Sequence, residues 1–193
     1  DTPDHPIALH LMGVIAYQNR ENHVALDFIK KALISKPDYA EAHNNLGVIF
    51  KELKEIDEAI TCYNRALTIN NDYAEAHYNL GVVLKEIGKL DEAITSYKRA
   101  LEHKPDYAEA LYNLGNALNE CSEFEGAIAS YRETITIKPD YAEAHSNLGN
   151  VLKKIGKPND AKYSYRKALA IKPDFAEAHS NLGAVLRVLG QLN

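Results

Sequence analysis

The stretch YAEAHNNLGVIF, residues 39–50, returns along the chain with few changes. It reads YAEAHYNLGVVL at 73–84, YAEALYNLGNAL at 107–118, YAEAHSNLGNVL at 141–152 and FAEAHSNLGAVL at 175–186, so each step is 34 residues. One step back from the first copy, Gly13 matches the glycine that every later copy carries. A fixed period of this length is typical of proteins in which each repeat packs on its neighbours.

Each repeat contains two stretches in which apolar and small residues have helical spacing. Counting Ala40 as position 1, these residues recur at positions 7, 8 and 11 and again at positions 20, 24 and 27. A break at positions 15 to 17 separates the two predicted helices, and a proline near position 32 ends the second. Asp38, followed three residues later by Glu41, predicts a capping box at the start of the first helix.

Composition and charge exclude several classes of protein. The 193 residues are 46% hydrophobic and 25% charged, which is a globular composition. The formal charge of −5 argues against a nucleic-acid or membrane binder, because such proteins usually carry a basic patch. The longest apolar stretch, residues 7–17, is too short to span a bilayer. Cys62 and Cys121 lie in different repeats, which predicts free thiols and is compatible with a cytoplasmic protein.

A helix–turn–helix unit of 34 residues with small residues at positions 8, 20 and 27 resembles the tetratricopeptide repeat (TPR). The family's signature places are filled in the second repeat by Leu46-Gly47-Phe50-Ala59-Tyr63-Ala66. The resemblance covers essentially the whole chain and implies an all-α, right-handed α-solenoid of five full repeats and one truncated repeat. We therefore expect a single array made of residues 6–39, 40–73, 74–107, 108–141, 142–175 and the partial repeat 176–193.

Asparagine recurs at position 6 of five repeats, although it is less favourable than alanine in a helix by up to about 0.7 kcal/mol. A helical wheel places positions 2, 6, 9 and 13 opposite the side that packs on the partner helix. If the TPR resemblance holds, these positions line the concave wall that solenoids use for binding. Since an amide both donates and accepts hydrogen bonds, a row of amides is suited to grip an extended peptide backbone. A solvated or inter-repeat hydrogen-bonding role is the alternative.

The asparagine row is similar to the ladder in the TPR superhelix of O-linked N-acetylglucosamine transferases and Spindly proteins, including bacterial relatives. The stretches DYAEAHNNLGVIFKE at 38–52 and KPDYAEAHSNLGNVLKKIGK at 138–157 carry this resemblance, and Leu11 of the first repeat departs from it. In that family the ladder binds substrate polypeptides and feeds a separate glycosyltransferase domain. The resemblance therefore implies a substrate-recruiting arm, and no residue of such a catalytic domain is present in the sequence.

We predict a site for a protein or peptide in extended conformation at positions 6, 9 and 12 of the first helices. Its residues are Asn45, Asn79, Asn113, Asn147, Asn181, Lys51, Lys85, Asn116, Asn119, Asn150 and Lys153. No nucleophile, phosphate-loop or zinc motif is present, so we expect neither enzymatic activity nor a cofactor. The histidines that recur at position 4 are a whole repeat apart, too far for one metal ion, so we expect them to pack. The alternative function is a scaffold that self-associates through its ends, because Val185, Leu186 and Leu189 lack a partner helix.

Overall fold

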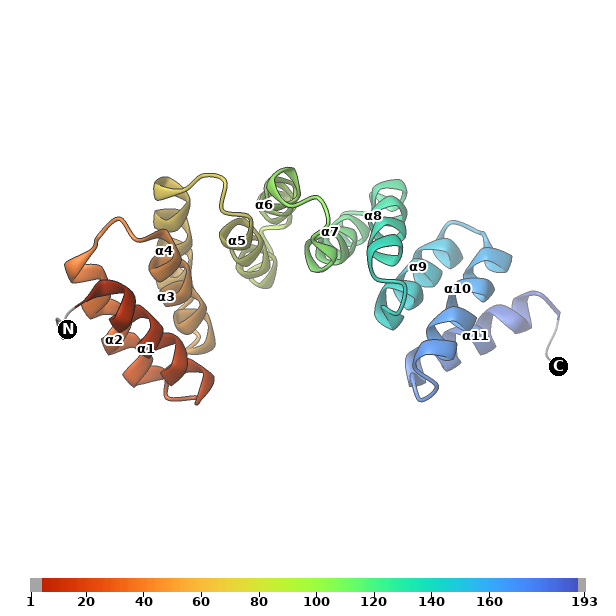
Figure 1. The fold of residues 1–193 in the computed structure, drawn as a ribbon. Helices are drawn as coiled ribbons and strands as arrows, with labels where there is room; N and C mark the ends of the chain where they lie inside the picture. The colour runs from red at the N-terminus through yellow and green to blue at the C-terminus, as the bar shows by residue number, and fades with distance from the viewer. Residues whose placement is uncertain (1–4, 191–193) are drawn as a thin grey trace. The chain divides into compact units, whose positions relative to one another are not determined.

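The computed structural model describes residues 5–190, which form eleven α-helices and no strand (Figure 1). The helices are α1 Pro6–Gln18, α2 Asn22–Ser35, α3 Ala40–Glu52, α4 Ile56–Ile69, α5 Ala74–Glu86, α6 Leu90–His103, α7 Ala108–Glu120, α8 Phe124–Ile137, α9 Ala142–Lys154, α10 Pro158–Ile171 and α11 Ala176–Val188. The predicted all-α architecture of tandem helix–turn–helix repeats is confirmed. Among these helices, none has the length and apolar character needed to cross a bilayer.

The chain divides into two compact units, unit 1 with residues 1–104 and unit 2 with residues 105–193. Within each unit an odd-numbered helix packs on the even-numbered helix that follows it, and that helix packs on the next odd-numbered one. Neighbouring odd-numbered helices also touch, whereas even-numbered helices touch only odd-numbered ones in the described part of each unit. The odd-numbered helices therefore form one side of each unit, which we call the odd-helix face. That all repeats belong to a single array stays a prediction.

The core of each full repeat from the second onward is a tyrosine on the even-numbered helix that lies against a glycine on the preceding odd-numbered helix. Tyr63 and Tyr165 are fully buried, and a Cβ built on Gly47 or Gly149 lies only 2.7 Å from Cε1 of the facing ring. A real Cβ does not approach a neighbour this closely, so the position requires glycine. The alanines at positions 20 and 27 are also fully buried where the two helices meet. These contacts explain the small residues that define the repeat.

The odd-numbered helices bury a second side that the helical wheel did not predict. Position 3 is fully buried as Ala42 in α3 and position 10 is 1% exposed as Ile49. Both positions lie on the side that packs against the preceding helix pair. In α1 the equivalent of position 10, Ile15, is 57% exposed. Positions 3 and 10 thus belong to the seam between repeats rather than to the core of one repeat.

The predicted capping box is wrong. Helix α3 begins one residue later than expected, with Tyr39 rather than Asp38 as its N-cap, and no side-chain hydrogen bond caps it. The glutamate at position 2 pairs elsewhere: Oε1 of Glu75 lies 3.2 Å from Nζ of Lys104, which follows the last residue of α6. The same pairing occurs in unit 2, where Oε1 of Glu143 lies 3.5 Å from Nζ of Lys172. These ion pairs join the start of one helix to the end of its partner.

A matched pair of glycine substitutions tests this account of the core. Gly149→Ala should lower the free energy of unfolding by about 1–3 kcal/mol, because the new methyl group overlaps the ring of Tyr165. Gly183→Ala, at the same position in α11, should raise it by up to about 1 kcal/mol, because no atom lies within 4 Å and alanine favours the helix. Urea unfolding followed by circular dichroism measures both. Equal effects of the two substitutions would show that the tyrosine contact does not require glycine.

Candidate functional site

The five asparagines at position 6 lie on the odd-helix face, one in each of α3, α5, α7, α9 and α11, and all are half-buried. They are Asn45, Asn79, Asn113, Asn147 and Asn181. In every case whose contacts are described below, the side-chain nitrogen points to the preceding odd-numbered helix. We call these five residues the ladder asparagines. They therefore lie where two repeats meet, and part of each side chain is exposed.

In unit 1 the amide nitrogens of the ladder asparagines bind within the chain. Nδ2 of Asn45 donates to Nε2 of His10 in α1 at 2.8 Å, and Nδ2 of Asn79 donates to Oδ1 of Asn44 in α3 at 3.0 Å. Oδ1 of Asn79 accepts no hydrogen bond from the residues that the structure describes. The amide of Asn79 thus ties two repeats together and keeps one hydrogen-bond acceptor open.

In unit 2 two asparagines form a linked pair between α7 and α9. Nδ2 of Asn147 donates to Oδ1 of Asn116 at 2.9 Å and to the hydroxyl of Tyr112 at 3.1 Å. The same Oδ1 of Asn116 accepts a hydrogen bond of 2.8 Å from the hydroxyl of Tyr131. Oδ1 of Asn147 accepts no hydrogen bond from the described residues, and Nδ2 of Asn116, which has two hydrogens to donate, has only the hydroxyl of Tyr112 as a further partner. The pair therefore keeps one acceptor and one donor available side by side.

The next asparagine pair, between α9 and α11, is closed. Nδ2 of Asn181 donates to Oδ1 of Asn150 at 3.0 Å, and Nζ of Lys153 donates to Oδ1 of Asn181 at 2.7 Å. Nδ2 of Asn150 donates to Oε1 of Glu177 at 3.1 Å, and its Oδ1 also accepts from Tyr165 at 2.8 Å. Both amides here are bound by neighbouring side chains on each end. The closed pair differs from the open pair by the contacts with Lys153 and Glu177, and position 12 of α7 is Asn119 where α9 has Lys153.

The predicted basic neighbours are partly engaged within the chain. Nζ of Lys51 lies 3.4 Å from Oε1 of Glu86 in an ion pair that is partly exposed. Oδ1 of Asn119 accepts a 3.0 Å hydrogen bond from Nζ of Lys154. Lys85 is half-buried in α5. These exposed pairs are weak and break easily in water, so they do not prevent the lysines from binding an acidic group.

Sequence reasoning missed an apolar pocket of about 250 Å³ on the odd-helix face of unit 1. It is lined by Val14, Tyr17, Gln18, Ile29, Asn45, Val48 and Ile49, from α1, α2 and α3. The ladder amide of Asn45 is thus next to a space that an aliphatic side chain can enter. Valine at position 9 in the first three repeats, where the fourth and fifth have asparagine, is the sequence signal that indicates it.

The histidines at position 4 hold the loops between repeats. Nε2 of His43 lies 2.9 Å from the carbonyl oxygen of Pro37, and that of His145 lies 3.0 Å from the carbonyl oxygen of Pro139. His77 and His179 bind the equivalent carbonyls at 2.9 Å and 2.8 Å. Within residues 5–190 no group of three or more histidine, cysteine or acidic side chains is arranged to hold a metal ion.

A chain of helix pairs with a glycine–tyrosine core and a polar odd-helix face belongs to the class of helical repeat proteins. Models of the TPR family match residues 49–88, 84–120 and 115–156, and a further tetratricopeptide repeat model matches residues 142–175. Because these matches cover more than half of the chain, the chain belongs to the tetratricopeptide repeat family.

Solved structures of TPR proteins are similar to the chain. The crystal structure of MamA is 27% identical with a TM-score of 0.79 and covers 86% of this chain and 97% of MamA. YrrB, a TPR protein with an unusual peptide-binding site, is 23% identical with a TM-score of 0.79 over 93% and 92% of the two chains. PilF of Pseudomonas aeruginosa is 20% identical with a TM-score of 0.86 over 96% and 85%. A search of curated proteins finds no match.

His10 makes the first seam sensitive to pH. Its Nε2 accepts the hydrogen bond from Asn45 and its Nδ1 lies 3.0 Å from the hydroxyl of Tyr39, so the ring is neutral in this arrangement. Burial lowers the pKa of His10 below its usual 6.5, and the carboxylate of Glu41 opposes that shift. Burial also lowers the pKa of His77. The unfolded chain therefore binds more protons than the folded chain in this pH range.

The contribution of His10 to stability should be complete above pH 6.5 and should be lost as the pH falls through its lower folded-state pKa. Urea midpoints measured from pH 7.5 down to pH 5 should fall, and His10→Gln should reduce the fall, because glutamine cannot take up the proton. His77 accounts for part of the remainder. His23→Gln, a change at an exposed residue of α2, serves as the control. A pH profile that His10→Gln leaves unchanged would contradict the assignment.

Proposed function

We propose that the chain is a protein-interaction module that holds an extended polypeptide along the odd-helix face by means of the ladder asparagines. The polypeptide backbone, rather than particular side chains, is the main feature that is recognised. Asn79 in unit 1 and the Asn116–Asn147 pair in unit 2 are the principal contacts. Position 12 lies one helical turn after position 9 of the odd-helix face. Its lysines, Lys51, Lys85 and Lys153, add attraction for acidic side chains of the ligand.

The observation that carries this proposal is the open pair in unit 2. One peptide unit offers one N–H donor and one C=O acceptor. Oδ1 of Asn147 and Nδ2 of Asn116 offer the complementary acceptor and donor, joined by a hydrogen bond of 2.9 Å that holds the two amides in place. Because the amides are already ordered by Tyr112 and Tyr131, binding costs little side-chain entropy.

The apolar pocket beside Asn45 supports the same function. A ligand backbone bound near Asn45 would place an aliphatic side chain within reach of Val14 and Val48, and burial of such a side chain contributes about 1.5–3 kcal/mol when it is complete. YrrB, which shares the fold, is itself described as having a peptide-binding site. A peptide is therefore a ligand class that this fold accommodates in another protein.

The sequence resemblance to O-linked N-acetylglucosamine transferases adds a finer proposal. In it the bound polypeptide is the substrate of a glycosyltransferase, and this chain presents the polypeptide to that enzyme. The chain itself acts by binding, since the ladder offers hydrogen-bonding groups without a nucleophile or an activated base. The finer proposal requires the same backbone contacts, so the same variants test its binding step.

A backbone-modified peptide gives the direct test. A neutral, unstructured peptide rich in serine, threonine and valine is titrated into the ¹⁵N-labelled chain, and NMR shifts are expected at Asn79, Asn116 and Asn147. N-methylation of the peptide backbone removes its N–H donors and should abolish the shifts. Asn79→Ala with Asn147→Ala should weaken binding by about 1–3 kcal/mol, since each hydrogen bond contributes about 0.5–1.5 kcal/mol.

The control for this test is the pair Asn64→Ala and Asn159→Ala, which removes two exposed amides from even-numbered helices. It should leave both binding and the melting temperature unchanged. Circular dichroism shows whether the ladder variants stay folded. Equal binding of the N-methylated peptide, or full binding by the folded ladder variants, would refute recognition of the backbone.

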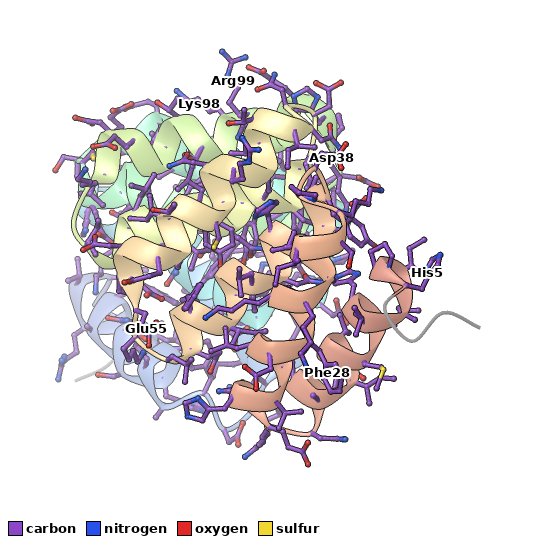
Figure 2. The ribbon with its side chains drawn as sticks, turned by 90° about the vertical axis from the view of Figure 1, so that its left-hand side faces the viewer. His5, Phe28, Asp38, Glu55, Lys98 and Arg99 are labelled. Carbon is purple, nitrogen blue, oxygen red and sulfur yellow. The ribbon has the colours of Figure 1, made fainter. Side chains whose placement is uncertain are left out.

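A second candidate function is self-association through α1, which an exposed apolar stripe on that helix favours. Ile7, Leu11, Met12 and Ile15 are 48%, 54%, 47% and 57% exposed. Later repeats carry glutamate and asparagine where Ile7 and Leu11 stand. The surface of α1 is therefore apolar at positions where the surface of α3 is polar. Figure 2 views the molecule from the side of α1 and α2 and labels Phe28 on α2. A second copy of the chain could cover this stripe.

Analytical ultracentrifugation over a wide concentration range separates the two functions. Self-association through α1 predicts a mass that rises with concentration and returns to that of the monomer in Leu11→Asn with Ile15→Lys. Both residues are more than half exposed, so the variant should keep its helicity. The matched control is Val188→Asn at the end of α11, which is 77% exposed. A monomer at every concentration would exclude this second function.

A further inference from the structure

A large cavity lies on the side of unit 2 away from the ladder. It is a groove of about 820 Å³ between α8 and α10, with α9 as its floor. Leu148 and Leu152 form the buried floor, at 7% and 3% exposure. Tyr163 and Ile171 of α10 stand on one wall, 63% and 37% exposed, and Ile135 of α8 stands on the other. We call this the outer groove.

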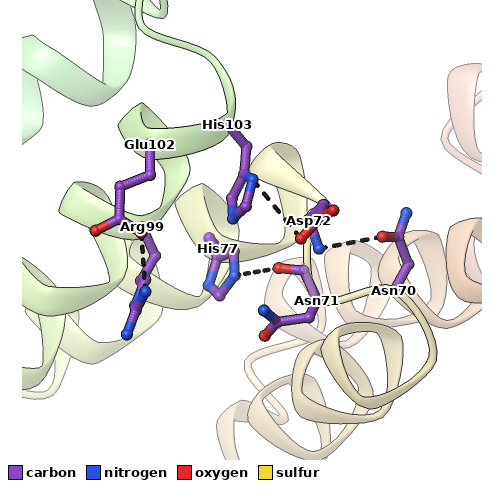
Figure 3. Close-up of polar contacts among 7 residues, drawn as sticks. All are labelled: Asn70, Asn71, Asp72, His77, Arg99, Glu102 and His103. Atoms are coloured by element: carbon purple, nitrogen blue, oxygen red, sulfur yellow. Dashed lines mark hydrogen bonds and ion pairs between the residues drawn. The ribbon is translucent and has the colours of Figure 1, made fainter.

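The equivalent groove in unit 1, between α4 and α6, is smaller and polar, with a volume of about 460 Å³. Thr95, Glu102 and His103 occupy the places that Tyr163, Ala170 and Ile171 occupy in unit 2. Figure 3 shows that Glu102 pairs with Arg99 and that His103 pairs with Asp72.

The ionisable groups drawn in Figure 3, at the groove of unit 1, contact one another or the backbone. Nη1 of Arg99 donates to Oε2 of Glu102 at 2.8 Å. Nδ1 of His103 lies 3.7 Å from Oδ1 of Asp72, and the His103 ring stacks on that of His77 with 6.1 Å between centroids. A few substitutions therefore convert a self-contained polar surface in one repeat into an open apolar groove in another.

The outer groove also carries cations without carboxylate partners. Arg132 of α8 and Lys167 of α10 occupy positions 25 and 26 of their repeats, so they stand at about the same height on opposite walls. Neither is in an ion pair within the described residues. For Lys167 the reason is that Ala170 replaces the glutamate that pairs with Arg99 in unit 1. Nζ of Lys167 lies 5.5 Å from the centroid of the Tyr163 ring. Asp160 is at the opposite end of α10, in its first turn.

We propose that the outer groove docks an amphipathic helix of a partner protein, with an apolar stripe on the floor and carboxylates that meet Arg132 and Lys167. A helix suits the site because two parallel walls with an apolar floor are the form in which amphipathic helices bind grooves. Carboxylates suit it because the two unpaired cations lie on both edges of the apolar strip. This site is separate from the ladder, so the chain binds two polypeptides on two faces of unit 2.

A pair of synthetic helical peptides tests the proposal. Each peptide has 14 residues, the length of α10, with leucines along one side and glutamates on both edges, and its twin has lysines instead. The glutamate peptide, titrated into the ¹⁵N-labelled chain, should shift amide signals of α8, α9 and α10 and should bind less tightly as salt is added. The lysine twin should bind at least about tenfold more weakly, since two cations repel it.

The decisive variant gives the outer groove the side chains of unit 1: Tyr163→Thr, Ala170→Glu and Ile171→His together. All three residues are exposed, so the fold should survive, and binding should fall by about tenfold or more because an aromatic anchor and the open cation are lost. The reverse change, Thr95→Tyr with Glu102→Ala, His103→Ile and Asn64→Arg, which supplies the equivalent of Arg132, should create a second site in unit 1. Asn147→Ala, which alters the ladder face, is the control and should leave binding of the helical peptide unchanged.

Each other outcome overturns the proposal. Equal binding of the two peptides removes the role of Arg132 and Lys167. Undiminished binding by the folded triple variant places the peptide elsewhere, as do shifts confined to other helices. An absence of shifts with the glutamate peptide at millimolar concentration rejects the helix site. Because the ladder test uses an extended peptide and different variants, failure of either site leaves the result for the other unaffected.

Discussion

In four of the repeats the ring of a buried tyrosine occupies the space that a Cβ on the facing helix would need. The built Cβ lies 2.7 Å from Cε1 in each case, and glycine is the only residue that lets the two helix axes come this close. The first repeat reaches the same result with Ile29, whose Cγ1 lies 2.5 Å from the Cβ built on Gly13. Once this contact sets the helix pair, the opposite side of the odd-numbered helix turns toward the preceding pair. The ladder asparagines lie on that side because of the packing and not because of a ligand.

The helices and their order could be predicted because every repeat carries its own local signals. Spacing, breaks and small residues recur every 34 residues, so an error at one place is corrected by the other copies. The capping box failed because Tyr39 takes the N-cap and Glu75 binds a lysine at the far end of the partner helix. The burial of positions 3 and 10 was not predicted for a related reason. A helical wheel of one helix does not show that Ala42 and Ile49 pack on a different repeat.

The candidate site could be located from the sequence, but the state of its hydrogen-bonding groups could not. The atom that each ladder asparagine binds belongs to a residue about one repeat earlier: His10 for Asn45, Asn44 for Asn79, and Asn116 with Tyr112 for Asn147. Those partners sit at positions 5 and 9, which vary between repeats. The two roles considered for the asparagines, inter-repeat hydrogen bonding and ligand binding, are therefore not exclusive. The nitrogen serves the first, and in α9 the oxygen is left for the second.

Variation between the repeats is concentrated where it does not affect the core. The glycine, the tyrosine and the two alanines barely change, because a wrong volume there disturbs the packing of both helices. Position 9 changes from valine to asparagine, which alters the odd-helix face. Between the third and the fifth repeat, positions 22, 29 and 30 change from polar to apolar, which opens the outer groove. One such change leaves a buried hydroxyl without a partner. Tyr63 lies in the repeat that has Val48 at position 9 and has no hydrogen-bond partner, whereas Tyr131 donates to Asn116, which takes that position in its own repeat. An unsatisfied buried hydroxyl destabilises the fold by about 1–3 kcal/mol. Val48 therefore has a cost in stability, and its contribution to the apolar pocket beside Asn45 is the benefit that the structure offers in return.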